Sequence, residues 1–130
     1  CAAGTGRFLE VMARALEVDL DSFGEYSLSA ANASRISSLC TVFAESEVIS
    51  LIAKGEARAN IIAGIHDAVA ARVAALANRV GVQAPLMMTG GVAKNIGVVK
   101  ALESRLGEIK VLPSAQVNGA IGAAVLAARL

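Results

Sequence analysis

Two cysteines, Cys1 and Cys40, are the first candidates for chemistry in this chain. Neither belongs to a C-x-x-C pair, which excludes a zinc ribbon or a self-contained ferredoxin site. Two thiolates cannot complete a four-ligand site, so any remaining ligands would come from a second copy of the chain or from a segment outside it. A free cysteine is also an ordinary small apolar side chain, and the composition and spacing alone favour that packing role.

Two glycine-containing turns could approach a ligand closely. Gly4-Thr5-Gly6 precedes a helical pattern, with Thr5 as a candidate N-cap, and unpaired N–H groups at a helix start can hold an anion. Gly90 and Gly91 follow a short apolar run, and Lys94 and Asn95 come next. At the carboxyl edge of a parallel sheet, such a turn lets the backbone approach a ligand. A flexible helix entry and a tight turn without a ligand would show the same patterns.

The remaining polar groups give weaker indications. His66 is the only histidine, and no second histidine or cysteine lies at ligand spacing on its helix, so we expect a structural role. Asp67, Glu45 and Glu47 are expected to be solvated helix charges. The sequence contains no phosphate-binding G-x-x-x-x-G-K-[ST] motif, and it offers no pair of nucleophile and base.

The elements that must position these residues are mostly helical. The 130 residues are 55% hydrophobic but only 3% aromatic, which favours an aliphatic, alanine-rich core of close-packed helices. Hydrophobic periodicity predicts helices over 8–16, 45–53, 61–80, 92–106 and 117–125. It also predicts a loop or short helices over 19–38, a β-prone segment over 39–43, and strands over 85–89 and 109–112.

The order of these last elements indicates the fold class. Strand, helix, strand and helix with short connections imply a parallel pair with a right-handed crossover, and therefore an α/β protein. The continuous apolar run at 85–89 predicts a strand buried on both faces. We expect Gly55, Gly81 and Gly107 to end the helices that precede them.

Charge and hydropathy exclude several classes of partner. The formal net charge is +1 and the basic residues are scattered, so we expect no nucleic-acid partner. The longest apolar run, Gly119 to Ala128, has ten residues, too few to span a membrane, and no secretion signal opens the chain. We therefore expect a cytoplasmic protein with no membrane partner. The first residue is Cys1 rather than Met, so we also expect a segment upstream.

Four segments together resemble one family. They are CAAGTGRFL at 1–9, LCTVFAESEV at 39–48, TGGVAKN at 89–95 and VNGAIGAA at 117–124. These segments closely resemble the ATPase activators of 2-hydroxyacyl-CoA dehydratases and the related ATPase subunits of benzoyl-CoA reductase. That family belongs to the actin, Hsp70 and sugar-kinase superfamily. The resemblance covers essentially the whole chain, and the two cysteine motifs at this separation are specific to the iron-sulfur members.

The resemblance implies a fold and a set of site residues. The fold would be the C-terminal lobe of an actin/Hsp70-like (ribonuclease H-like) ATPase, with residues 1–130 as one partial domain and the phosphate-binding lobe upstream. Cys1 and Cys40 would bind a 4Fe-4S cluster shared between two subunits. The residues implied for ATP or ADP with Mg are Gly90, Gly91, Ala93, Lys94 and Asn95, with Gly119 in the segment that joins the lobes. No catalytic residue is implied within the chain.

The implied function is part of an ATP-dependent activator that passes a low-potential electron to an acyl-CoA dehydratase or reductase. Its second subunit would be identical or a paralogue, and the isolated chain would be inactive. Two alternatives remain open. One is a small-sugar or acid kinase of the same superfamily, because the adenosine motif is shared. The other is a non-catalytic dimerisation fragment.

Overall fold

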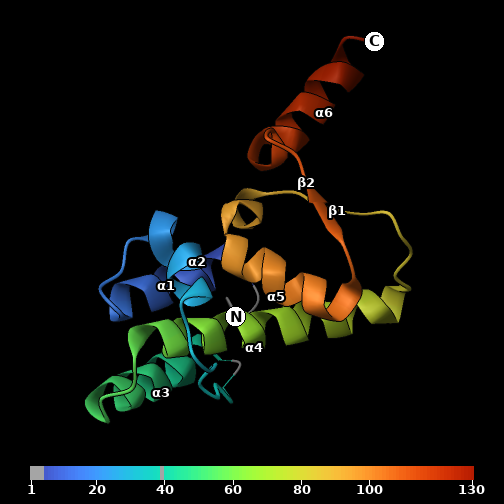
Figure 1. Ribbon diagram of the computed structural model, residues 1–130. Coiled ribbons are helices and arrows are strands. Elements are labelled where there is room, and N and C mark those ends of the chain that lie inside the picture. The colour runs from blue at the N-terminus through green and yellow to red at the C-terminus, as the bar shows by residue number, and fades with distance from the viewer. Residues whose placement is uncertain (1–4, 39) are drawn as a thin grey trace.

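Helices dominate the structure, a computed structural model that describes residues 5–38 and 40–130 (Figure 1). The α-helices are α1 (Gly6–Ala15), α2 (Leu20–Leu28), α3 (Thr41–Ala53), α4 (Arg58–Val80), α5 (Ile96–Leu106) and α6 (Asn118–Ala127). The strands are β1 (Leu86–Met88) and β2 (Ile109–Val111), and two 3-10 turns are η1 (Gly91–Lys94) and η2 (Ala115–Val117). Each predicted helix therefore has a counterpart in the structure.

The long helix α4 forms the centre of the core. Its residues Ile61, Ile62 and Ile65 are fully buried, and α2, α3 and α5 all pack against it. In the view of Figure 1, α5 lies along one side of α4 and α3 along the other. By length and composition alone, the 23-residue α4 could cross a membrane, but 44% of its most apolar window is buried inside the protein. A core helix passes the same test, and the packing shows α4 in that role.

Three glycines allow helices to approach neighbouring segments closely. A Cβ at Gly24 of α2 would lie 2.7 Å from Oδ1 of Asn95, at the start of α5. A Cβ at Gly64 of α4 would overlap the carbonyl oxygen of Ser34, and one at Gly97 of α5 would overlap a buried imidazole. These crossings bring segments distant in sequence into direct contact.

The strands form the predicted parallel pair. Leu86 lies opposite Ile109, and Met88 lies opposite Val111. Burial on both faces, however, was a wrong prediction, because Met87 is 56% exposed. Leu86 and Met88 are partly buried, and Met88 packs against the core. The sheet has two strands of three residues each, and the core covers only the face that Met88 occupies.

The β-prone segment over 39–43 is also a correction, because α3 begins at Thr41. Cys40 has extended backbone at the N-cap position, and the N–H of Ala44 donates to its carbonyl oxygen over 2.9 Å. Val42 and Phe43 are both 67% exposed, so their β propensity is not supported by packing. Ala44 and Val48, one helical turn apart, are buried instead. Leu39 lies outside the described residues.

The helix predicted from residue 92 has a break near its start. Residues 91–94 form the 3-10 turn η1, and α5 begins at Ile96. Asn95 separates them as the N-cap of α5, because its Oδ1 accepts a hydrogen bond from the N–H of Val98 over 3.1 Å. The sequence pattern missed this break because the apolar positions continue in helical phase through it.

Candidate functional site

A hollow of about 560 Å³ opens where the starts of α1 and α2 face the turn over residues 91–95. Its lining consists of Gly6, Leu9, Glu10, Leu20, Asp21, Gly91, Val92, Lys94, Asn95 and Gln116. Apolar side chains therefore share this lining with a lysine, two amides and the two carboxylates of Glu10 and Asp21. Apolar surface combined with convergent polar groups is typical of small-molecule sites.

Backbone hydrogen bonds hold the turn over 90–95 at both ends. Gly90 has a φ of 94°, in the left-handed region that favours glycine, and its N–H donates to the carbonyl oxygen of Ala115 over 2.8 Å. The N–H of Asn95 donates to the carbonyl oxygen of Val92 over 2.9 Å. A Cβ at Gly91 would meet no heavy atom within 4 Å, so the backbone there faces open space.

The structure brings only some of the predicted nucleotide residues to this hollow. Gly91, Lys94 and Asn95 line it, whereas Ala93 is buried beneath the turn. Gly90 is not among the lining residues, and its contribution is the hydrogen bond that ties the turn to Ala115. Gly119 lies in the first turn of α6, outside the lining.

The other glycine turn meets the same hollow. Gly6 lines it, and a Cβ at that position would lie 3.2 Å from Cγ2 of Val92. Thr5 stands at the N-cap position of α1, as predicted, and its carbonyl oxygen accepts the N–H of Phe8. No local pattern indicated Leu20, Asp21 or Gln116, because tertiary packing alone brings them here. Gly4 lies outside the described residues.

His66 lies behind the hollow and is 1% exposed. Its Nδ1 lies 3.0 Å from the hydroxyl of Ser27, and its Nε2 lies 3.3 Å from Nδ2 of Asn95. The ring of Phe23 packs edge-on against the imidazole at 5.3 Å between centroids. Burial lowers the pKa of His66 to about 4, so the ring is neutral at physiological pH. The predicted structural role thus includes a direct contact with a residue of the hollow.

Cys40 is exposed at the N-cap of α3, and its thiol is free. Cys1, the other predicted cluster ligand, lies outside the described residues. Within residues 5–38 and 40–130, no group of three or more histidine, cysteine or acidic side chains could hold a metal ion.

A carboxylate holds the segment that leads to Cys40. Glu47 accepts hydrogen bonds from the backbone N–H groups of Ser37 and Ser38 and from the Ser37 hydroxyl, at 3.0–3.1 Å. Burial alone would raise the pKa of Glu47, but these hydrogen bonds outweigh it and lower the pKa below its usual value. Glu47 is therefore a structural anchor, and its prediction as a solvated charge was wrong. Asp67 is exposed, as predicted for a solvated charge, and its carboxylate also pairs with Arg105 over 2.7 Å.

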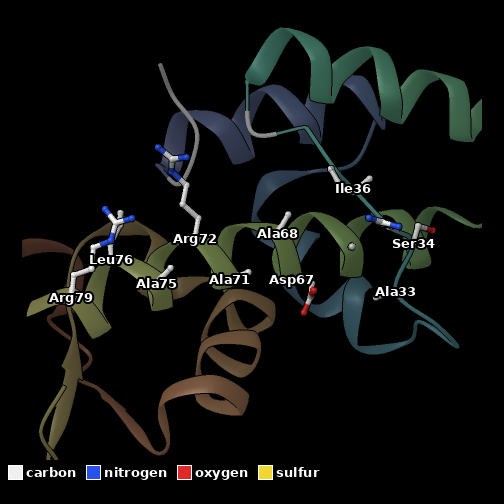
Figure 2. A pocket seen from close by; sticks show the side chains of 12 residues that line it. Ala33, Ser34, Ile36, Asp67, Ala68, Ala71, Arg72, Ala75, Leu76 and Arg79 are labelled. Atoms are coloured by element: carbon white, nitrogen blue, oxygen red, sulfur yellow. The ribbon is translucent and has the colours of Figure 1, made fainter. Parts of the chain in front are cut away.

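A second hollow, of about 710 Å³, runs along α4 beside residues 33–36 (Figure 2). Alanines of α4 form much of its lining, and Arg35, Arg72 and Arg79 surround it. None of these three arginines forms an ion pair with the described residues. None of the predicted nucleotide residues lines this hollow.

Comparisons with known proteins agree with the resemblance. The sequence pattern of the BadF/BadG/BcrA/BcrD ATPase family matches residues 1–127. The chain is 59% identical to the (R)-2-hydroxyglutaryl-CoA dehydratase activating ATPase of Acidaminococcus fermentans, over 98% of the chain and 49% of that protein. It is 39% identical to a benzoyl-CoA reductase subunit of Thauera aromatica, over 96% of the chain and 47% of that protein.

A solved structure agrees as well. The activator of the 2-hydroxyisocaproyl-CoA dehydratase from Clostridium difficile, solved with bound ADPNP, superimposes with a TM-score of 0.95 at 51% identity. The match covers 98% of this chain and 48% of that one. The chain therefore spans about half the length of the relatives it matches.

Proposed function

Because the chain belongs to the BadF/BadG/BcrA/BcrD ATPase family, we propose that it is the nucleotide- and cluster-binding half of an ATP-dependent activator of an acyl-CoA dehydratase or reductase. The observation that carries this proposal is the hollow between α1, α2 and the turn over 91–95, in a chain whose structural relative was solved with ADPNP. The activator would pass a low-potential electron to its partner enzyme, as the family resemblance implies.

The hollow is suited to the adenosine half of ATP or ADP. Leu20 and Val92 offer apolar surface for a base, and Lys94 and Asn95 offer polar groups at its edge. The open space in front of Gly91 permits close approach of the ligand to the backbone. We propose that residues 1–130 form one lobe, and that the Mg and phosphate ligands lie in the other half of the relatives' length.

The cluster would lie at the start of α3. The thiol of Cys40 is free and exposed at a helix N-terminus, where unpaired N–H groups favour an anionic ligand. These properties fit a ligand of a 4Fe-4S cluster at a protein surface, with Cys1 as the second ligand of the same chain. Four thiolates are required, so two subunits, identical or paralogous, would share one cluster. When bound, the cluster would supply the electron that the partner enzyme receives.

The partner would be a dehydratase or reductase component rather than nucleic acid or a membrane, and we place the protein in the cytoplasm. The named relatives support this assignment, since they are activators of dehydratases or a subunit of a reductase.

The decisive experiment is anaerobic purification of the protein at the full length of its relatives, with iron and sulfide analysis. The wild type should contain about four irons per two subunits. Replacing Cys40 with serine should abolish the cluster absorbance and weaken dimerisation, because the bridge between subunits loses a thiolate from each side. Nucleotide binding by the same variant serves as the control and should persist. Full iron per subunit in the Cys40→Ser protein would exclude the shared cluster.

A further inference from the structure

We propose that His66 and Ser27 are positioning residues for the nucleotide site: they fix the side-chain amide of Asn95, and through it the turn that carries Gly91 and Lys94. This inference rests on the proposed nucleotide-binding function of the hollow. Neither His66 nor Ser27 lines the hollow, so both would act only through Asn95.

The hydrogen-bond partners assign every proton in this network. Val98 donates its N–H to Oδ1 of Asn95 over 3.1 Å, so the amide atom facing His66 is the donor Nδ2, at 3.3 Å from Nε2. Nε2 therefore accepts, and the imidazole proton resides on Nδ1. That proton points to the hydroxyl oxygen of Ser27 at 3.0 Å. The Ser27 hydroxyl donates onward to the carbonyl oxygen of Gly24 over 2.7 Å.

The packing leaves this network no alternative arrangement. His66 is 1% exposed, and Phe23 meets its ring edge-on. Gly97 lies so close that any side chain there would overlap both the imidazole and the Ser27 hydroxyl. In the same way, a Cβ at Gly24 would press on Oδ1 of Asn95 from the other side, at 2.7 Å. A neutral imidazole with its proton on Nδ1 is thus built into the crossing of α2, α4 and α5.

The consequence for the hollow follows from how the turn is anchored. One end is tied to η2 by the hydrogen bond from Gly90 to Ala115, and the other end is held by the backbone hydrogen bond from Asn95 to Val92 together with the side chain of Asn95. Lys94 is exposed and directly precedes Asn95, so it depends on that second anchor for its position. Without the imidazole, Nδ2 of Asn95 loses its acceptor and the amide is held only by the hydrogen bond from Val98, so the turn is less well fixed and ligand binding must order it.

Two amide substitutions of His66 test this inference. Glutamine can place a polar atom near the position of Nε2, facing Asn95, whereas asparagine can place one only near Nδ1, facing Ser27. Both are neutral and polar and differ by one methylene group, so a purely structural role would separate them in stability but not in the ADP affinity of the folded variants. In the full-length protein at pH 7.5, we expect His66→Gln to bind ADP within about threefold of wild type. We expect His66→Asn to bind about tenfold more weakly, since it lacks the hydrogen bond to Asn95.

The kinetic readout should separate positioning from loss of fold. For His66→Asn, the KM for ATP should rise while kcat stays within about twofold of wild type, as expected for loss of uniform binding. Circular dichroism confirms that each variant is folded at the assay temperature. Ser27→Ala provides an independent variant if His66→Asn does not fold. It removes the acceptor for Nδ1–H, and we expect it to weaken ADP binding severalfold.

The outcomes distinguish this inference from the proposed function. Lys94→Glu tests the site itself: if wild type and Lys94→Glu bind ADP equally, or wild type does not bind ADP, the proposed nucleotide site is wrong. If Lys94→Glu binds weakly but the asparagine and glutamine variants bind ADP equally, the positioning role is wrong. Wild-type ADP affinity in a folded Ser27→Ala protein would also overturn it.

Discussion

The neutral imidazole of His66 makes the stability of this protein depend on pH. Burial lowers the pKa of His66 to about 4, and the only polar groups that the structure places against the ring are a hydroxyl and an amide. In the unfolded chain, the same group would titrate near its ordinary value of about 6.5. Between these two pH values, the unfolded state binds a proton that the folded state does not. Stability therefore falls as the pH falls through this window.

We expect the 130-residue chain to lose about 2 kcal/mol of unfolding free energy between pH 7 and pH 5 from this group alone. Urea unfolding at the two pH values measures the loss. The His66→Gln chain is the control, because it has no group that titrates in this range at that position. Hydrogen bonds lower the pKa values of Glu47 and Glu103 from their ordinary value, so these carboxylates titrate on the acid side of the His66 window and contribute little between the two measurements. An equal loss in His66→Gln would show that other groups cause the pH dependence.

At the scale of the elements, glycine has opposite effects in two helices. In α4, Gly64 lies against the backbone of residues 33–36, where a Cβ would overlap the carbonyl oxygen of Ser34. In α6, a Cβ at Gly122 would meet no heavy atom within 4 Å. Both glycines lie inside helices, so the intrinsic preference of the helix for alanine applies to both. Only the contact with a neighbouring segment distinguishes them.

We therefore predict that Gly64→Ala lowers the unfolding free energy of the chain by at least about 2 kcal/mol, because the new methyl group forces backbone apart. Gly122→Ala should leave it unchanged or raise it by up to about 1 kcal/mol. Chemical denaturation of the two variants beside wild type measures both effects. If Gly64→Ala is as stable as wild type, the close approach of α4 to residues 33–36 is wrong.

The elements also show what the sequence can predict. Periodicity predicted the helices around Phe8, Ile61 and Val99 because each buries one face against the core, and that burial leaves a repeating pattern. Val42 and Phe43 misled the prediction because these β-branched and aromatic side chains are largely exposed, and local propensity does not report exposure. The break at Asn95 was missed for a related reason, since its capping hydrogen bond lies within a continuous apolar phase.

The sequence indicated residues of the candidate site only where they are close neighbours in the chain. Gly91, Lys94 and Asn95 are neighbours in sequence, and the glycine pair indicated them. Leu20, Gln116 and His66 come to the same place from three other segments, through crossings that no local pattern records. Glu47 was misjudged for the same reason, because its partners Ser37 and Ser38 lie ten and nine residues earlier in the chain.

At the scale of the whole molecule, one large apolar surface is left uncovered. Helix α6 has no buried residue, and it extends away from the rest of the structure (Figure 1). Ile121, Val125 and Leu126 are all at least 46% exposed. A helix that is apolar on all sides is normally buried. Burial of this face against another protein surface is therefore the physical expectation for α6.

The hollow is also open on one side, like the surface of α6, and this limits what it can bind by itself. Its lining has one cation, Lys94, and two carboxylates, Glu10 and Asp21, so its charge does not favour a polyphosphate. Phosphoryl transfer depends on positioned Mg and phosphate contacts. Among the described residues, no group of three or more histidine, cysteine or acidic side chains is placed to hold a metal ion. If the hollow is the proposed nucleotide site, this lobe would contact the adenosine half and leave the phosphates without partners.

We therefore predict that the 130-residue chain binds ADP weakly and does not hydrolyse ATP. Loss of the second face of a two-lobed site should weaken an affinity of micromolar order to about millimolar, a change of about 4 kcal/mol. Calorimetric titration with ADP and a phosphate-release assay with ATP and Mg measure the two properties, with the full-length protein as the positive control. Adenosine should bind the chain nearly as well as ADP does, because the phosphates gain little from this lobe. Robust ATP turnover by the chain alone would contradict the assignment of the phosphate ligands to the other half.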